Sequence, residues 1–175
     1  MVLSDVDILR YIMKGKLVII PFTEKQVREN GIDLRVGEGW CMLREVADVL
    51  DPYDPEENLD KFYVCKQQKE FVLQPYRRYL LTTMEHIKLP PELMGFVELR
   101  STFARLGFII PPTIIDGGFE GQITIEVMAP PFPVWLKAGT RFLHIVFDEV
   151  SSPIHKPYSG KYQGQRGVTL PKLPP

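Results

Sequence analysis

Polar residues inside two otherwise apolar stretches are the ones whose types and spacing could do chemistry. The first stretch, residues 98–107, reads ELRSTFARLG, and the second, residues 114–127, reads IIDGGFEGQITIEV. Arginine presents a planar fork of N–H donors that suits anions, while hydroxyls and carboxylates can hold or transfer protons. These stretches therefore contain the candidate residues for anion binding and acid–base chemistry.

Glu126 is the most unusual of these candidates. In a strand, the polar residues 122, 124 and 126 share one face, opposite the apolar residues 123, 125 and 127. A carboxylate buried there without a partner would be costly. Two interpretations stay open: Glu126 is a surface charge on a solvent-facing strand, or it is a functional carboxylate in a site.

Several other kinds of site have no matching pattern. His86, His144 and His155 lie far apart, and none stands in a metal-binding HExxH or HxE frame. His144 follows apolar neighbours, which favours a packed structural histidine. The chain also lacks a Walker A loop, a dinucleotide fingerprint and the Pro-Cys-x-x-Cys pair of zinc nucleobase deaminases. Residues 51–60 carry five acids and no base, which predicts a solvated loop because the ligand spacing of calcium loops is absent.

Composition limits the class of protein. The 175 residues are enough for one domain with a real core, and a net charge of −1 gives no basic field for a nucleic-acid polymer. Cys41 and Cys65 are too few for a disulfide scaffold and suit a reducing compartment. No apolar run approaches a membrane span of about 18 residues, and the N-terminus is acidic where a signal peptide would be basic. We expect an intracellular, cytoplasmic protein that binds neither nucleic acid nor membrane.

The elements that must position the candidate residues are short. A Ser4–Asp7 cap predicts a helix that ends near Gly15, and a Thr23–Gln26 cap predicts a short turn. Strands are predicted at residues 17–20, 32–36, 62–65, 71–73, 79–83, 94–99, 122–128 and 141–150. Many short strands separated by Gly and Pro turns indicate a barrel or sandwich. The Gly- and Pro-rich residues 159–175 predict a mobile arm.

Four motifs give the chain a family resemblance. Residues 100–107 (RSTFARLG), 115–121 (IDGGFEG), 124–126 (TIE) and 161–167 (KYQGQRG) look like the RSSxARxG, IDxGFxG, TLE and C-terminal GKYQxQxG segments of dCTP deaminases. Residues 3–5 and 29–36 also fit, and Pro111-Pro112-Thr113 resembles archaeal members. The resemblance covers nearly the whole chain and is weakest over residues 38–70.

This resemblance implies a fold and an assembly. The family shares its fold with the trimeric dUTPases, so we expect a mainly β protein, a distorted β-barrel or jelly-roll of the trimeric dUTPase-like type with short N-terminal helices. Residues 1–158 would form the barrel domain. Residues 159–175 would form a flexible C-terminal arm that closes over the nucleotide. The family forms a homotrimer with sites between subunits, and its members are often inhibited by dTTP.

The resemblance also implies a reaction, the hydrolysis of dCTP to dUTP and ammonia on the route to dUMP and dTTP precursors. Glu126 would act as general base and acid at C4 without a metal, because a single desolvated carboxylate can perform both proton transfers. Ser101 would hold the water or amino group, and Arg105 would bind phosphate and bias the Ser101–Glu126 network. Arg100 would bind the triphosphate, and Asp116 would accept a hydrogen bond from the 3′-hydroxyl.

The full set of implied substrate-binding residues is wider. It comprises Arg100, Ser101, Thr102, Phe103, Ala104, Arg105, Asp116, Thr124, Ile125, Glu126, Tyr158, Lys161 and Gln165. No protein metal ligand and no zinc are expected, and Mg²⁺ would accompany the triphosphate.

Two alternatives remain open beside the deaminase. A dUTP diphosphatase, or a bifunctional enzyme ending at dUMP and pyrophosphate, would use Asp116 to activate water, and the interval from Ser101 to Asp116 suits either activity. Archaeal dUTPases usually carry an apolar residue where this chain has Glu126, which favours the deaminase. A non-catalytic nucleotide-binding module would bind dCTP without releasing ammonia.

Overall fold

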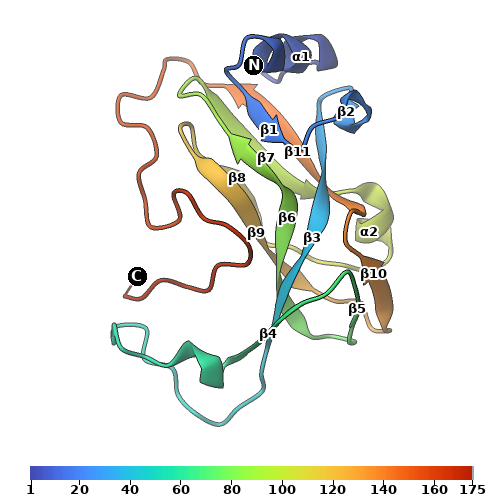
Figure 1. Cartoon of the computed structure of the whole chain (residues 1–175), viewed down its shortest axis with the longest axis vertical. Helices are drawn as coiled ribbons and strands as arrows, with labels where there is room; N and C mark the ends of the chain where they lie inside the picture. The colour runs from blue at the N-terminus through green and yellow to red at the C-terminus, as the bar shows by residue number, and fades with distance from the viewer. Residues whose placement is uncertain (175) are drawn as a thin grey trace.

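Apolar alternation along short strands builds the body of the protein. The computed structural model describes residues 1–174 and curls most of the strands into a half-open barrel (Figure 1). The strands are β1 (Val18–Ile20), β2 (Val27–Arg28), β3 (Gly31–Leu43), β4 (Tyr63–Gln67), β5 (Glu70–Leu73), β6 (Arg78–Lys88), β7 (Leu93–Leu99), β8 (Thr113–Ile115), β9 (Glu120–Met128), β10 (Val134–Lys137) and β11 (Arg141–Glu149). The mainly β barrel of dUTPase-like type expected from the sequence is confirmed.

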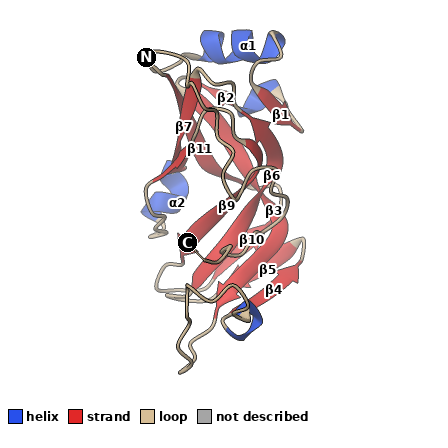
Figure 2. Ribbon diagram, turned by 90° about the vertical axis from the view of Figure 1, so that its left-hand side faces the viewer, coloured by secondary structure: helices blue, strands red, loops and turns tan. Residues whose placement is uncertain are grey.

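The strand order explains how distant segments meet. The main sheet runs β1-β6-β3-β11-β7-β8, with β2 and β4 paired to β3 and β9 paired to β6, and β5 and β10 form a separate two-stranded ribbon. Every strand pairing within residues 1–174 is antiparallel, and the long strands β3 and β6 each have a register shift where they bend. The bends let one sheet turn its apolar face inward around a single core. Figure 2 shows the curled sheet from the side.

Two short helical segments open the chain, as expected. Helix α1 (Asp5–Met13) begins where the Ser4 hydroxyl accepts a hydrogen bond from the Asp7 amide, and it buries Ile8. The 3₁₀ turn η1 (Glu24–Gln26) has the capping box predicted from Thr23 and Gln26. A second 3₁₀ turn, η2 (Leu59–Lys61), lies beside β4. No helix in residues 1–174 is long and apolar enough to cross a membrane.

Five elements were missed by the sequence patterns, namely η2, β2, α2, β8 and β10. Helix α2 (Ser101–Arg105) forms directly after β7, and the strands β8 and β10 are only three and four residues long. Such short elements carry too few residues to show a period. Phe103 anchors helix α2 to the core, because its ring packs 4.5 Å from Phe142 and 5.8 Å from Phe108, measured between ring centroids.

The two cysteines form a disulfide, which corrects the expectation drawn from their number. Cys41 of β3 and Cys65 of β4 are directly opposite in the antiparallel register, and their Cα atoms lie 4.0 Å apart. The bond closes a loop with a sequence separation of 24 residues, which contains the acidic stretch. That stretch, residues 51–60, is mostly exposed, as predicted.

Candidate active site

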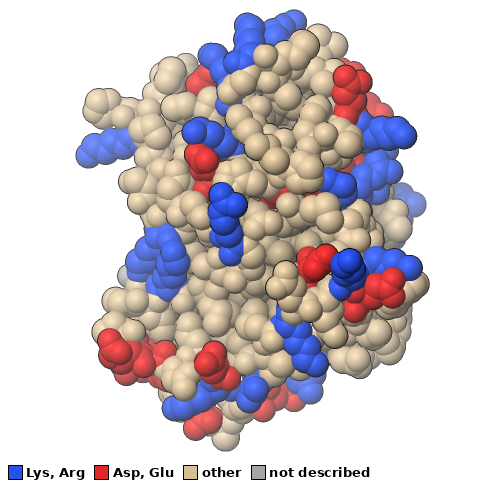
Figure 3. Space-filling view, viewed as in Figure 1, with Lys and Arg blue, Asp and Glu red and all other residues tan. Residues whose placement is uncertain are grey.

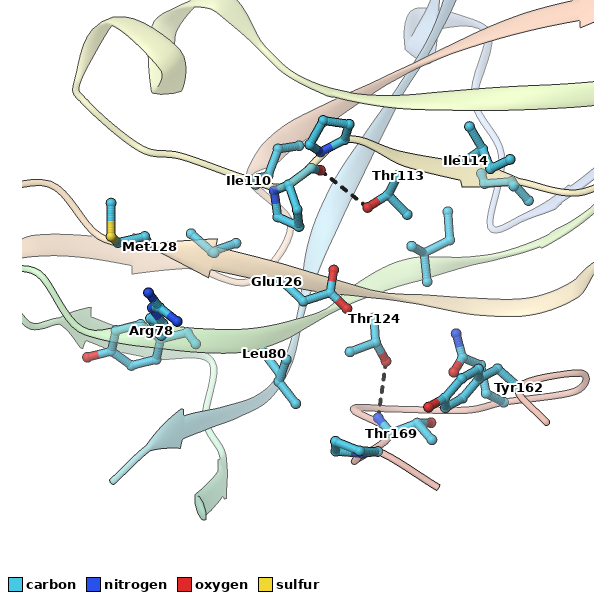
Figure 4. Close-up of a pocket in the computed structure, with 18 of the residues that line it drawn as sticks. Arg78, Leu80, Ile110, Thr113, Ile114, Thr124, Glu126, Met128, Tyr162 and Thr169 are labelled. Carbon is cyan, nitrogen blue, oxygen red and sulfur yellow. Dashed lines mark hydrogen bonds between the residues drawn. The ribbon is translucent and has the colours of Figure 1, made fainter. Parts of the chain in front are cut away.

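One cavity of about 820 Å³ opens between the outer face of the sheet and the C-terminal segment. Its floor comes from β6 and β9, one wall from residues 109–116, and the opposite wall from residues 158–171. Figure 4 shows Glu126 of β9 between Leu80 and the segment that carries Ile110 and Thr113. The lining is mostly apolar, with a few convergent polar groups, which is the usual character of a small-molecule site.

The predicted alternation along β9 is confirmed. Ile123, Ile125 and Val127 are buried in the core, while the polar side chains between them face outward. Glu126 lies opposite Leu80 on β6, so both side chains stand on the cavity floor. In the single chain Glu126 is exposed, and the desolvation expected of it would require a ligand or another chain above it. Ile125 points into the core, so its side chain does not line the cavity.

Asp116 is placed at the rim by a tight turn. Its carbonyl accepts a hydrogen bond from the Phe119 amide at 3.1 Å, and its side chain lines the cavity. Glycine is required next to it, since a Cβ on Gly117 would come within 3.0 Å of the Leu93 carbonyl and one on Gly118 within 2.5 Å of Pro157. The turn therefore holds the exposed carboxylate of Asp116 at the rim of the cavity.

Two of the predicted C-terminal residues reach the cavity and one does not. Tyr158 packs on Phe119 with ring centroids 5.8 Å apart, and both Tyr158 and Gln165 line the cavity. Lys161 is outside the lining residues, and its ammonium group donates to the Lys172 carbonyl at 3.3 Å. The boundary predicted at residue 158 and the mobility of the arm stay predictions.

The residues predicted from the RSTFAR motif lie away from this cavity. None of residues 100–105 lines it, and in Figure 1 helix α2 and the C-terminal segment lie on opposite sides of the sheet. Ser101, Thr102, Ala104 and Arg105 are exposed, whereas Phe103 is the anchor. Within one chain, the motif and Glu126 are therefore not brought together.

Asp33 lies in the segment 29–36 that fits the family, but it was not among the predicted site residues. It is 1% exposed, yet its carboxylate lies 3.1 Å from Arg100, 3.4 Å from Arg28 and 3.6 Å from Arg141. His144 also contacts it, with Nδ1 at 3.1 Å from Oδ1. One buried carboxylate thus gathers three arginines from three segments of the chain, and these partly exposed arginines remain accessible to an anion.

A family model described as dCTP deaminase-like matches residues 2–150. A dCTP deaminase from Sulfurisphaera tokodaii is 52% identical over 173 residues, covering 99% of this chain and 93% of that protein. A dCTP deaminase from Saccharolobus solfataricus is 50% identical, with 99% and 92% covered. The chain belongs to the dCTP deaminase-like family. The resemblance drawn from the motifs is confirmed.

Solved structures show the same fold beyond these relatives. The crystal structure of 2′-deoxycytidine 5′-triphosphate deaminase from Agrobacterium tumefaciens superposes with a TM-score of 0.68 at 22% identity, covering 85% of this chain. This chain spans 48% of that protein's length. A dUTPase of phage 80alpha has a TM-score of 0.50 at 13% identity, covering 82% of this chain and 96% of that one. At these identities the likeness concerns the fold alone.

Several lining residues of this family member were not found from the sequence. Arg78 and Leu80 lie on β6, which contains none of the family motifs. Tyr63 lies in the region where the family resemblance is weakest. Burial raises the pKa of Tyr63, and the nearby Tyr162 adds to the shift. Burial does not alternate along this part of β6, since residues 79–83 are all buried, so the sequence offered no periodic signal for Leu80.

Charge on the surface of this family member is mixed. Lysine, arginine and acidic side chains are interspersed on the face shown in Figure 3. Within residues 1–174, no group of three His, Cys, Asp or Glu side chains is arranged to hold a metal ion.

Proposed function

We propose that this protein hydrolyses dCTP to dUTP and ammonia. The observation that carries the proposal is the position of Glu126, a carboxylate on the floor of an apolar cavity, within the TIE segment that matches the family's TLE. Relatives about half identical over nearly the whole chain carry the name dCTP deaminase. The cavity is large enough for a nucleoside, at about 820 Å³.

In the proposed reaction, water adds to C4 of cytosine and the amino group leaves as ammonia. Glu126 takes the proton from the attacking water and delivers a proton to the departing nitrogen, so one carboxylate serves both steps. Leu80 and Ile110 beside it supply apolar cover. A bound base completes that cover and excludes water from the carboxylate, which strengthens its interactions with the reacting atoms.

The residues of helix α2 enter the proposal through a second copy of the chain. Ser101 and Arg105 are exposed and lie away from the cavity in their own chain. A homotrimer that seats α2 of one subunit at the cavity of the next brings the Ser101 hydroxyl and the Arg105 guanidinium to Glu126. Ser101 then holds the water or the amino group, and Arg105 orients the Ser101 and Glu126 side chains.

The triphosphate and sugar take the remaining polar groups. Arg100, held by Asp33, offers bidentate donors to phosphate, and the exposed Asp116 accepts from the 3′-hydroxyl. Mg²⁺ enters with the nucleotide, because phosphate oxygens are the hard ligands that this ion prefers. When bound, the ion neutralises phosphate charge, and zinc has no part in the proposal.

The deciding experiment is incubation of the protein with dCTP and Mg²⁺, followed by chromatography of the products. The expected products are dUTP and an equal amount of ammonia. EDTA should suppress their formation, and Mg²⁺ alone should restore it. Formation of dUMP and pyrophosphate would show a bifunctional enzyme. Binding of dCTP without ammonia release would overturn the proposal, and added dTTP tests for inhibition.

A further inference from the structure

The C-terminal segment lies along the outer edge of β9. Among the described residues, β9 has β6 as its strand partner on one side. On the other side, the Gly164 amide donates to the Glu120 carbonyl at 2.7 Å, and the Gln122 amide donates to the Gln165 carbonyl at 2.9 Å. Farther along, the Thr169 amide donates to the Thr124 hydroxyl at 3.1 Å. The segment thus runs in the same direction as β9 and satisfies its free edge.

Gln122 lies at the centre of this contact. Its side-chain oxygen accepts from the Gly167 amide at 2.7 Å, and its main-chain carbonyl accepts from the Gln165 side chain at 2.7 Å. With its own amide bonded to Gln165, Gln122 makes three hydrogen bonds to the segment. Gly121 permits the close approach, because a Cβ there would stand 3.0 Å from the Gln165 carbonyl oxygen.

The other end of the Gln122 side chain is held by the barrel. Its Nε2 donates to the Thr83 carbonyl at 2.8 Å, in the part of β6 where the register with β9 shifts. The same carbonyl accepts from the Thr82 hydroxyl at 3.3 Å, and these side-chain donors matter because an unpaired buried carbonyl is costly. A side-chain amide suits this position because it carries a donor for the β6 carbonyl and an acceptor for the Gly167 amide on one planar group.

We propose that Gln122 is a positioning residue that docks residues 164–169 on β9. The docked segment carries Gln165 and Thr169 to the wall of the cavity, and Tyr162 just before it also lines that wall. Gln122 therefore holds the wall that faces Glu126, and it acts on the site through that wall without contacting the substrate. The kinetic part of this inference rests on the proposed deaminase activity, whereas the docking itself does not.

Trypsin cleavage after Arg166 tests docking without reference to activity. Arg166 is exposed in the docked segment, so cleavage there requires the backbone around it to leave β9. Gln122→Ala removes the bonds to Gly167 and Thr83 and should speed this cleavage at least about tenfold in the absence of nucleotide. Gln68→Ala, at an exposed glutamine between β4 and β5, is the matched control and should cleave like the unaltered protein.

A kinetic measurement and a second variant complete the test. Gln122→Ala should raise KM for dCTP more than it lowers kcat, with the melting temperature of the barrel nearly unchanged. If Gln122→Ala does not fold, Gly167→Ala decides, because the φ of 65° at this residue strains alanine while no atom lies within 4 Å to clash with its Cβ. Equal cleavage after residue 166 in the folded variants and the control would overturn the proposal. A protein that docks its segment but leaves dCTP intact would instead disprove the proposed function alone.

Discussion

The buried carboxylate of Asp33 lies 3.1 Å from the Arg100 guanidinium, at the residue that caps helix α2. This contact links strand β3 to the RSTFAR motif, which the chain holds away from its own cavity. Asp33 thereby fixes both a candidate phosphate ligand and the start of the helix that carries Ser101 and Arg105. The same carboxylate also offsets the charges of Arg28 and Arg141.

Neutralising Asp33 should be costly. In Asp33→Asn the surrounding cations lose their shared counter-charge, although the partly exposed arginines regain some hydration, so we expect a loss of about 2 kcal/mol in the free energy of unfolding. KM for dCTP should also rise, because Arg100 is no longer oriented. Urea unfolding measures the first effect, with Glu98→Gln on the exposed face of β7 as control. Equal stability of the two variants would contradict the assigned role.

Glu126→Gln should separate catalysis from binding. The amide keeps the size of the side chain but cannot accept the proton from water, so ammonia release should fall by at least about 10²-fold. Binding of dCTP, measured by calorimetry, should persist. Gln68→Ala again provides a surface control. Turnover close to that of the unaltered protein would remove Glu126 from the mechanism.

The Cys41–Cys65 disulfide should contribute to stability by restraining the unfolded chain. For a loop with a separation of 24 residues, Cys65→Ser should lower the free energy of unfolding by roughly 3 kcal/mol under oxidising conditions. Dithiothreitol should bring the unaltered protein to nearly the same value, since reduction opens the same loop. Identical unfolding curves with and without the reductant would argue that the bond does not form in solution.

The Lys16–Glu92 pair should make the free energy of unfolding depend on pH in the acidic range. A hydrogen bond from Lys16, at 2.7 Å, holds the pKa of Glu92 below its ordinary value of 4.5. A lowered folded-state pKa stabilises the protein above 4.5, and this contribution is lost as the pH falls through the folded-state value. The stability difference between the unaltered protein and Glu92→Gln should thus be constant near neutrality and shrink on acidification. A difference that grows on acidification would reverse the assigned sign.

The local features of the fold could be predicted from the amino-acid sequence. The Ser4–Asp7 cap, the alternation of buried and exposed residues along β9 and the glycine turn after Asp116 all follow from contacts within a few residues, and the structure contains each of them. The family motifs were equally readable, because they are contiguous. Each of these signals depends on backbone geometry that repeats over two to four residues.

The strand order of the folded sheet determines which distant groups meet. Asp33 and His144 are 111 residues apart and become partners because β3 and β11 are neighbours in the sheet. The disulfide, the docking of the C-terminal segment on Gln122 and the separation of α2 from the cavity depend in the same way on strand order. A buried charge takes whichever partner the folded sheet brings within reach, and that choice leaves no periodic signal along the chain.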